Sequence, residues 1–280
     1  MTEIENLIEM QENRIPQENE YTDSESGFIY CSKCRTSKQM KLFIFGRNSI
    51  VPIMCSCEKE QAEKEKALKE EREFNKRVER LRADGLKGDE LYGYRFENDK
   101  GYNPEIEKAH IYVDKWDEML EKASGFIVWG GVGTGKTFFA GCIANALIDK
   151  GVPVLMTNFA DILNIVTGKF SEERSRYIEN LNRYSLLIID DLGIERCTEF
   201  ALENIYNVID SRYRSGKPMI LTTNLTLQEM KGTDNLMYSR IYSRILERCL
   251  PLMINNINIR NEKSASNIAE AKNVFSSANK

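Results

Sequence analysis

A glycine-rich octapeptide constrains this sequence more than any other stretch. Residues 130–137 read GGVGTGKT and fit the pattern G-x-x-x-x-G-K-T. The apolar run GFIVW precedes them and the helical pattern TFFAGCIANALIDKG follows, which is the context that a phosphate-binding loop requires. Glycines let backbone N–H groups approach phosphate oxygens, and the following helix adds its positive N-terminal dipole. Motif and context together favour nucleotide binding over a glycine turn without a ligand.

The side chains of this loop have separate chemical tasks in such a site. Lys136 reaches the β and γ phosphates, and Thr137 offers its hydroxyl to Mg²⁺. We therefore expect ATP and Mg²⁺ as cofactors. The residues expected to contact the nucleotide are Gly130, Gly131, Val132, Gly133, Thr134, Gly135, Lys136, Thr137 and Phe138.

Short apolar runs alternate with helical patterns from about residue 91 onward. The runs are GFIVW, VPVLM, LLIID, PMILTT and LPLMI. Two intervening segments, TFFAGCIANALIDKG and EFALENIYNVIDSRYRSGK, have apolar residues at helical spacing. Strands that are apolar almost throughout and separated by helices indicate a parallel sheet buried on both faces. We expect an α/β fold of the P-loop NTPase type, with helices flanking a parallel sheet.

Two adjacent aspartates, Asp190 and Asp191, follow the apolar run LLII. A P-loop site needs a carboxylate at the end of a neighbouring strand to hold Mg²⁺, and Asp190 stands at that position. Asp191 is then placed to polarise the attacking water, since the metal neutralises one of the two charges. The alternative is an acidic pair that caps a strand before a turn. Asn224, after PMILTT, is a candidate for orienting the water, although asparagine is also a common turn former.

A later helical pattern, NLMYSRIYSRILERC, carries a row of arginines. Arg240, Arg244 and Arg248 are four residues apart, so they lie on one face of the helix. One interpretation is a solvated basic face. The other is an arginine finger that reaches the γ-phosphate bound to a neighbouring subunit.

Four of the seven cysteines form two close pairs, CSKC and CSC. They are Cys31, Cys34, Cys55 and Cys57. Without a secretion signal we expect a reducing compartment, where clustered thiols bind metal more often than they form disulfides. Four thiolates complete a tetrahedral Zn²⁺ site and leave no open catalytic position. We expect structural zinc rather than buried free cysteines, because so short a module has little core of its own.

The remaining segments are charged or polar. Residues 1–27 are rich in acids, and residues 58–88 carry Glu–Lys pairs four apart that predict a solvated linker helix. The stretch RTSKQMKLFIFGR is basic and aromatic, which fits contact with nucleic acid or docking onto a partner protein. The formal net charge of -4 means that any contact with DNA must be local or shared with a partner. No apolar run is long enough to span a membrane, so we expect a cytoplasmic protein without membrane contact.

Taken together, these motifs resemble the DnaC/IstB branch of AAA+ ATPases, which includes bacterial and phage helicase loaders and transposition helper ATPases. The resemblance covers about residues 90–260, through GFIVWGGVGTGKTFFAGCIANALIDKGVPVLMTN, LLIIDDLG, ILTTNLT and SRIYSRILER. It implies Asp190 as the Walker B metal residue, Asp191 at the position where many AAA+ proteins have glutamate, Asn224 as sensor 1, Arg244 as the finger with Arg240 beside it, and Arg260 in NNINIR as sensor 2.

The resemblance also implies a function. We expect an ATP-dependent loader that acts in DNA replication and binds single-stranded DNA and a replicative helicase as an ATP-dependent homo-oligomer. In such loaders the N-terminal domain engages the helicase, and some of these domains bind zinc. One rival is an IstB-type transposition helper acting on a transposase and duplex DNA, against which the four-cysteine site argues. The other is a nucleotide-gated adaptor with little turnover. The side chain of Asp191 is shorter than that of glutamate and reaches less far toward the water, so this alternative stays open.

The expected domain organisation follows from these segments. It comprises an acidic flexible arm at 1–27, a zinc-binding module at 28–57, a charged linker helix at 58–88, an AAA+ ATPase domain at 89–260 and a polar C-terminal tail at 261–280.

Overall fold

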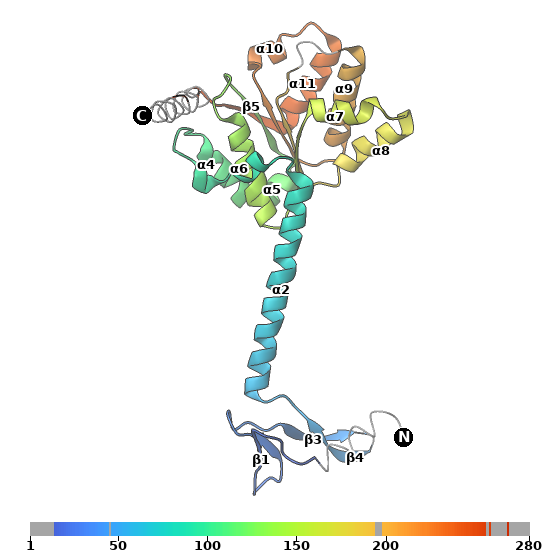
Figure 1. Cartoon of the computed structure of the whole chain (residues 1–280). Coiled ribbons are helices and arrows are strands. Elements are labelled where there is room, and N and C mark those ends of the chain that lie inside the picture. The colour runs from blue at the N-terminus through green and yellow to red at the C-terminus, as the bar shows by residue number, and fades with distance from the viewer. Residues whose placement is uncertain (1–13, 45, 194–197, 256–257, 259–267, 269–280) are drawn as a thin grey trace, which may run out of the picture. The chain divides into compact units, whose positions relative to one another are not determined.

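The computed structural model describes residues 14–44, 46–193, 198–255, 258 and 268 (Figure 1). The chain divides into two compact units, residues 1–75 and 76–280. Helix α2 (Ser56–Gly85) contains the boundary between them. Arg260 and the whole of 261–280 except Ile268 lie outside the described residues, as do positions 1–13 of the expected arm.

The first unit contains two short antiparallel hairpins. Strand β1 (Glu20–Thr22) pairs with β2 (Ile29–Cys31), and β3 (Gln39–Ile44) pairs with β4 (Arg47–Pro52). In the described part of this unit, the buried apolar side chains are those of Ile29, Cys31 and Cys55. So small a core cannot by itself offset the entropy lost when the segment becomes ordered.

Helix α2 follows the hairpins and is mostly exposed to solvent. Among its described residues only Val78 and Gly85 are buried, both in its last third. Exposed pairs such as Lys64–Glu60, at 2.6 Å, lie along its surface. Pairs of this kind stabilise a helix by about 0.3–0.5 kcal/mol each, so the long charged helix is held by its backbone hydrogen bonds and local pairs rather than by packing.

The second unit is built on a parallel sheet with helices on both faces. In the part of the chain that the structure describes, five strands run in the order β6-β7-β8-β5-β9. They are β5 (Gly125–Trp129), β6 (Val154–Asn158), β7 (Leu186–Asp190), β8 (Met219–Thr223) and β9 (Cys249–Met253). All four pairings are parallel. The α/β fold expected from the sequence, a parallel sheet with flanking helices, is confirmed.

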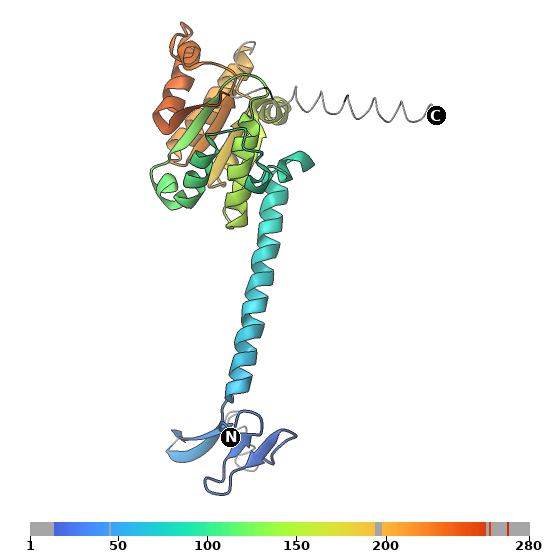
Figure 2. The same cartoon turned by 90° about the vertical axis from the view of Figure 1, so that its left-hand side faces the viewer.

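The helices fall into two groups, one on each face of the sheet (Figures 1 and 2). One face packs against α4 (Ile106–Asp114), α5 (Trp116–Glu121) and α6 (Lys136–Asp149). The other packs against α7 (Phe159–Thr167), α8 (Ser171–Leu181), α9 (Glu199–Arg214), α10 (Leu227–Lys231) and α11 (Leu236–Arg248). Two short elements, α3 (Asp89–Tyr92) and η1 (Phe96–Asn98), precede α4.

Strand β7 shows why its sequence is apolar throughout. Leu187 and Ile189 belong to the core on the α9 face, whereas Leu186 and Ile188 belong to the core on the α6 face. Successive side chains of a strand point to opposite faces, so a strand covered on both sides needs apolar residues at every position. Asp190 ends the run where the strand leaves the core.

A buried arginine ties the amino ends of β7 and β8 together. The guanidinium of Arg212 donates hydrogen bonds to the backbone carbonyls of Tyr184 (2.9 Å), Ser185 (2.9 Å) and Pro218 (2.6 Å). Burial lowers the pKa of this side chain to about 10, so it stays charged at neutral pH. These carbonyls precede the two strands, so Arg212 joins the amino ends of strands that pair in parallel from Leu187 and Met219 onward.

No helix in the described ranges is long and apolar enough to pass through a bilayer.

Candidate nucleotide and metal sites

The loop between β5 and α6 has a backbone that only glycine adopts readily. Gly130, Gly133 and Gly135 all have positive φ angles, of 149°, 77° and 97°. A Cβ on Gly130 would lie 2.2 Å from the carbonyl oxygen of Ile254, so the end of β9 excludes any side chain there. Gly135 is the N-cap of α6, which places the helix N-terminus directly after the glycine turn. The loop therefore has the shape that phosphate oxygens require.

The ammonium of Lys136 lies inside this loop. Its Nζ donates to the carbonyl oxygens of Gly130 (3.0 Å) and Gly131 (2.7 Å) and to Oδ1 of Asn224 (2.7 Å). Asn224 follows β8, the strand that lies next to β5. This contact therefore joins the P-loop to the carboxyl end of the neighbouring strand. The structure thus brings together Lys136 and Asn224, two of the residues predicted for the site.

Asp190 receives hydrogen bonds from two threonine hydroxyls. Thr137 Oγ1 lies 3.1 Å from each carboxylate oxygen, and Thr222 Oγ1 donates to Oδ1 at 2.5 Å. The pair of Thr137 and Asp190 comes from the P-loop helix and from β7, at the carboxyl edge of the sheet. A hydroxyl and a carboxylate in contact at this place offer two oxygen ligands for Mg²⁺.

Asp191 adopts a different backbone conformation from its neighbour. Its φ is +54°, in the left-handed region, and its N–H donates to Thr222 Oγ1 at 2.9 Å. The next residue, Leu192, donates its N–H to the Thr222 carbonyl at 2.7 Å. The chain therefore turns at Asp191 while Thr222 holds it, and the two adjacent carboxylates need not point in one direction. The single hydroxyl of Thr222 thus donates to the Asp190 carboxylate and accepts from the Asp191 N–H.

These residues surround one cavity of about 480 Å³. Its first wall is Val132–Phe138 together with Asp190, Asp191, Thr222 and Asn224. Its second wall comes from the segment before α4, with Glu90, Tyr94, Asn98, Asp99, Lys100, Tyr102 and Asn103. The volume is in the range of small-molecule sites, which is about 300–1,000 Å³. The sequence analysis did not identify Thr222 or the residues of the second wall. The only available signal for Thr222 was the polar end of PMILTT.

The arginines of α11 do not line this cavity. Arg244 is held within its own subunit, because its guanidinium contacts Asp210 at 2.8 Å and the Tyr206 hydroxyl at 3.0 Å and lies 4.8 Å from the centre of the Tyr206 ring. Arg240 is exposed, and its side chain has no ion pair with any residue that the structure describes. Arg248 packs over the Tyr213 ring at 5.0 Å.

Four thiols come together in the first unit. The Sγ atoms of Cys31, Cys34, Cys55 and Cys57 all lie within 4.8 Å of one another. In a tetrahedral Zn²⁺ site with bonds of about 2.3 Å the sulfurs are about 3.8 Å apart, so a small contraction of the cluster suits zinc. Cys31 ends β2 and Cys34 follows it, whereas Cys55 precedes α2 and Cys57 lies in its first turn. The donor set and the small apolar core both fit a metal that joins these elements.

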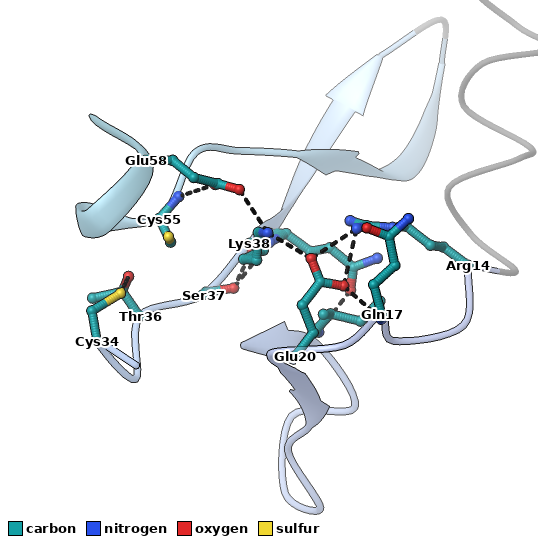
Figure 3. Close-up of polar contacts among 11 residues, drawn as sticks. Arg14, Gln17, Glu20, Cys34, Thr36, Ser37, Lys38, Cys55 and Glu58 are labelled. Carbon is teal, nitrogen blue, oxygen red and sulfur yellow. Dashed lines mark hydrogen bonds and ion pairs between the residues drawn. The ribbon is translucent and has the colours of Figure 1, made fainter. Parts of the chain in front are cut away.

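A network of charges supports the cysteine cluster (Figure 3). Lys38 Nζ contacts Glu20 at 2.5 Å and Glu58 at 2.7 Å, and Arg14 also binds Glu20, at 2.8 Å. The side chain of Glu20 is 4% exposed and that of Lys38 is 15% exposed. Lys38 donates hydrogen bonds to Glu20 and Glu58, and these bonds raise the pKa of Lys38. The bond between Lys38 and Glu58 also lowers the pKa of Glu58. Both groups are therefore charged at neutral pH.

This network reaches the cysteines through the backbone. Glu58 Oε2 accepts the N–H of Cys55 at 2.9 Å. Thr36 Oγ1 accepts the N–H of Ser56 at 3.0 Å and lies 3.0 Å from the Cys34 sulfur. The hydrogen bond with the Thr36 side chain lowers the pKa of the Cys34 thiol. Side chains around a metal site that orient its ligands in this way raise its affinity for the metal.

Comparison with known proteins identifies the family of this chain. Residues 59–267, well over half of the sequence, match the family described as IstB-like ATP binding protein. The chain belongs to this IstB-like family. The Replicative helicase loader DnaC of Escherichia coli (strain K12) is 31% identical over 157 residues, which are 54% of this chain and 60% of DnaC.

Solved structures confirm the fold of this IstB-like chain. The crystal structure of the DnaI matches with a TM-score of 0.52 and 20% identity, over 62% of this chain and 94% of that one. The crystal structure of the DnaC helicase loader matches with a TM-score of 0.51 and 22% identity, over 60% of this chain and 100% of that one. The matched part thus has the ATP-binding fold of the family, and the chain spans 60% of the length of the curated DnaC relative.

We predict that Lys38→Met destabilises the cysteine module. The change leaves the buried carboxylate of Glu20 with Arg14 alone, and breaking a buried ion pair costs about 3 kcal/mol. Amide hydrogen exchange in residues 28–44 should then become about 100-fold faster, since 1.4 kcal/mol corresponds to a factor of ten. Lys41→Met is the matched control, because Lys41 is exposed on β3, which begins directly after Lys38, and has no ion pair among the described residues. Equal exchange in both variants would contradict the role given to Lys38.

Proposed function

We propose that this chain is an ATP-hydrolysing helicase loader that acts in DNA replication. The observation that carries the proposal is the meeting of Lys136, Asp190 and Asn224 around one cavity in a member of an ATP-binding family. Its relative DnaC is by name a replicative helicase loader. By this analogy the partners are a replicative helicase and single-stranded DNA, and the protein works in the cytoplasm.

The proposed chemistry assigns one task to each side chain of the site. Lys136 Nζ exchanges its contacts with the Gly130 and Gly131 carbonyls for oxygens of the β and γ phosphates. Thr137 Oγ1 and the Asp190 carboxylate would hold Mg²⁺. Mg²⁺, when bound, neutralises charge on the phosphates and leaves Asp191 free to act as a base.

Hydrolysis needs a base and a group that orients water. The Asp191 carboxylate, beyond the turn that Thr222 holds, accepts the proton of the attacking water. Asn224 Oδ1, released when Lys136 moves to the phosphates, orients that water. P-loop proteins gain most of their rate from positioning and from stabilising charge, so these contacts decide the turnover.

A second subunit is proposed to complete the site. Arg240 and Arg244 lie outside the cavity of their own chain, so either one meets a γ-phosphate only in a neighbouring subunit of an ATP-dependent homo-oligomer. Arg240 is exposed, whereas Arg244 must first leave Asp210 and Tyr206. Arg260 stays the prediction for sensor 2.

The proposed division of labour places partner binding in the zinc module. In this proposal residues 28–57 bind Zn²⁺ and dock onto the helicase, 58–88 connect them to the ATPase domain at 89–260, and 1–27 and 261–280 are flanking segments. The small core of the module and its four converging sulfurs support the metal assignment.

Helicase binding tests the loader proposal directly. The full-length protein is mixed with the replicative helicase of its source and with single-stranded DNA, with and without ATP, and the complexes are separated by size. We expect a complex that needs ATP and that Lys136→Ala weakens at least about tenfold. Absence of a complex under ATP would overturn the proposal. A complex with a transposase and duplex DNA instead would identify a transposition helper.

Replacing Asp191 by Asn separates hydrolysis from binding. The amide cannot take the proton of the water, so turnover should fall about 100-fold while ATP affinity changes less than about twofold. Asp117→Asn, on the exposed face of α5, is the matched control and should leave both unchanged. Turnover that is already negligible in the unchanged protein, with ATP still bound, would identify a nucleotide-gated adaptor instead.

Metal content tests the zinc assignment. We expect about one zinc ion per chain in the purified protein, and Cys31→Ser should remove it while leaving ATP affinity within about twofold. Cys142→Ala changes a buried cysteine of α6 and should keep the zinc. A folded, zinc-free wild-type module would refute the assignment.

A further inference from the structure

Two adjacent threonines end β8, at the edge of the sheet that carries the nucleotide site. The ladder between β7 and β8 has its last paired residues at Ile189 and Leu221. Beyond them both chains enter turns, and the threonine hydroxyls supply further hydrogen bonds between the turns. Thr222 is 1% exposed and Thr223 is fully buried. A buried hydroxyl is costly unless it is hydrogen-bonded, so the partners of these hydroxyls show what each one holds.

The Thr223 hydroxyl joins the two turns to each other. Its Oγ1 donates to the carbonyl oxygen of Leu192 at 2.7 Å and accepts the N–H of Leu225 at 3.1 Å. Leu192 directly follows Asp191, and Leu225 directly follows Asn224. The single hydrogen of this hydroxyl is used in the first bond and a lone pair in the second, so the orientation of the side chain is fixed. One buried hydroxyl thus connects the turn of Asp191 with the turn of Asn224.

Thr223 makes this connection from the core and not from the cavity. Successive residues of a strand point to opposite faces, and the described lining of the nucleotide cavity includes Thr222 but not Thr223. Leu192, the partner of the Thr223 hydroxyl, is fully buried in the core on the α9 face. The Thr223 side chain can therefore influence the site through the backbone of the two turns, without contact with a nucleotide.

We propose that Thr223 is a positioning residue for ATP hydrolysis, which holds the Asp191 carboxylate and the Asn224 amide at the separation they need to act on one water. The inference rests on the roles proposed for Asp191 and Asn224. A displacement of a reacting group by about 1 Å can cost about 100-fold in rate, so a link of this kind matters for turnover even though it touches no substrate.

Thr223→Val tests the link, because valine keeps the branched shape of threonine and lacks the hydroxyl. Turnover by the full-length protein, counted per bound ATP, should fall about 30-fold, while KM for ATP changes less than about twofold. Thr223→Ser keeps the hydroxyl and should restore turnover to within about threefold. In an Asp191→Asn background, Thr223→Val should lower turnover less than about threefold further, because residues that act as a unit are not additive.

Amide hydrogen exchange of the nucleotide-free protein gives a readout besides activity. In Thr223→Val the Leu225 amide loses its acceptor and should exchange at least about tenfold faster. The Leu192 amide, which donates to the Thr222 carbonyl at 2.7 Å, should also exchange faster, because its turn is no longer held by Thr223. Thr157→Val on β6 is the matched control, and it should change neither turnover nor these exchange rates, since Thr157 does not line the cavity.

The outcomes separate this inference from the proposed function. Full turnover in Thr223→Val, an unchanged exchange rate of the Leu192 amide, or an equal loss of turnover with and without the Asp191 carboxylate would overturn the inference and leave the P-loop assignment intact. If the valine variant does not fold, Thr223→Ala, which also lacks the hydroxyl, is measured in its place with the same expected results. An unchanged protein that binds ATP without turnover would overturn the proposed hydrolysis together with this inference.

Discussion

Parallel pairing of β5, β7 and β8 is the constraint on which the rest of this structure depends. It places the carboxyl ends of three strands at one edge of the sheet, although the strands are far apart in the sequence. The P-loop follows β5, Asp190 ends β7 with Asp191 directly after it, and Asn224 follows β8. Both faces of the sheet are covered by helices, so this edge is where polar groups on adjacent strands meet without disturbing the core.

The adjacent aspartates illustrate how the edge is organised. Asp190 accepts hydrogen bonds from the hydroxyls of Thr137 and Thr222, and Asp191 turns away with a positive φ while its N–H binds the same Thr222 oxygen. A non-glycine residue in this conformation costs about 1 kcal/mol or more. The contacts from β8 offset that cost. Two like charges can therefore follow one another in the chain, as the roles proposed for Asp190 at the metal and Asp191 at the water require.

The first unit is stabilised differently from the second, because its apolar core is too small to keep it folded. Its order depends on polar groups: the buried pair of Lys38 and Glu20, the bridge from Lys38 to Glu58, and the four thiols that join the end of β2 to the start of α2. Charge pairs fix geometry well but contribute little net stability when their desolvation is counted. A metal bound by the thiols would supply the missing free energy.

The sequence by itself determined the five strands of the parallel sheet, the P-loop and the positions of Asp190, Lys136 and the four cysteines, but not the hairpins of the first unit. These follow from local patterns: apolar runs at strand length, glycines at fixed spacing and cysteine pairs. It did not determine that the Thr222 hydroxyl contacts both aspartates, that Asp210 holds Arg244, or that Asn103 lines the same cavity as the phosphate loop. Each of these contacts joins residues far apart in the chain, at 222 and 190, 210 and 244, and 103 and the loop at 130–137. Hydrogen bonds and cavities depend on distances in space, and only the pairing of the strands and the packing of the helices decided those distances.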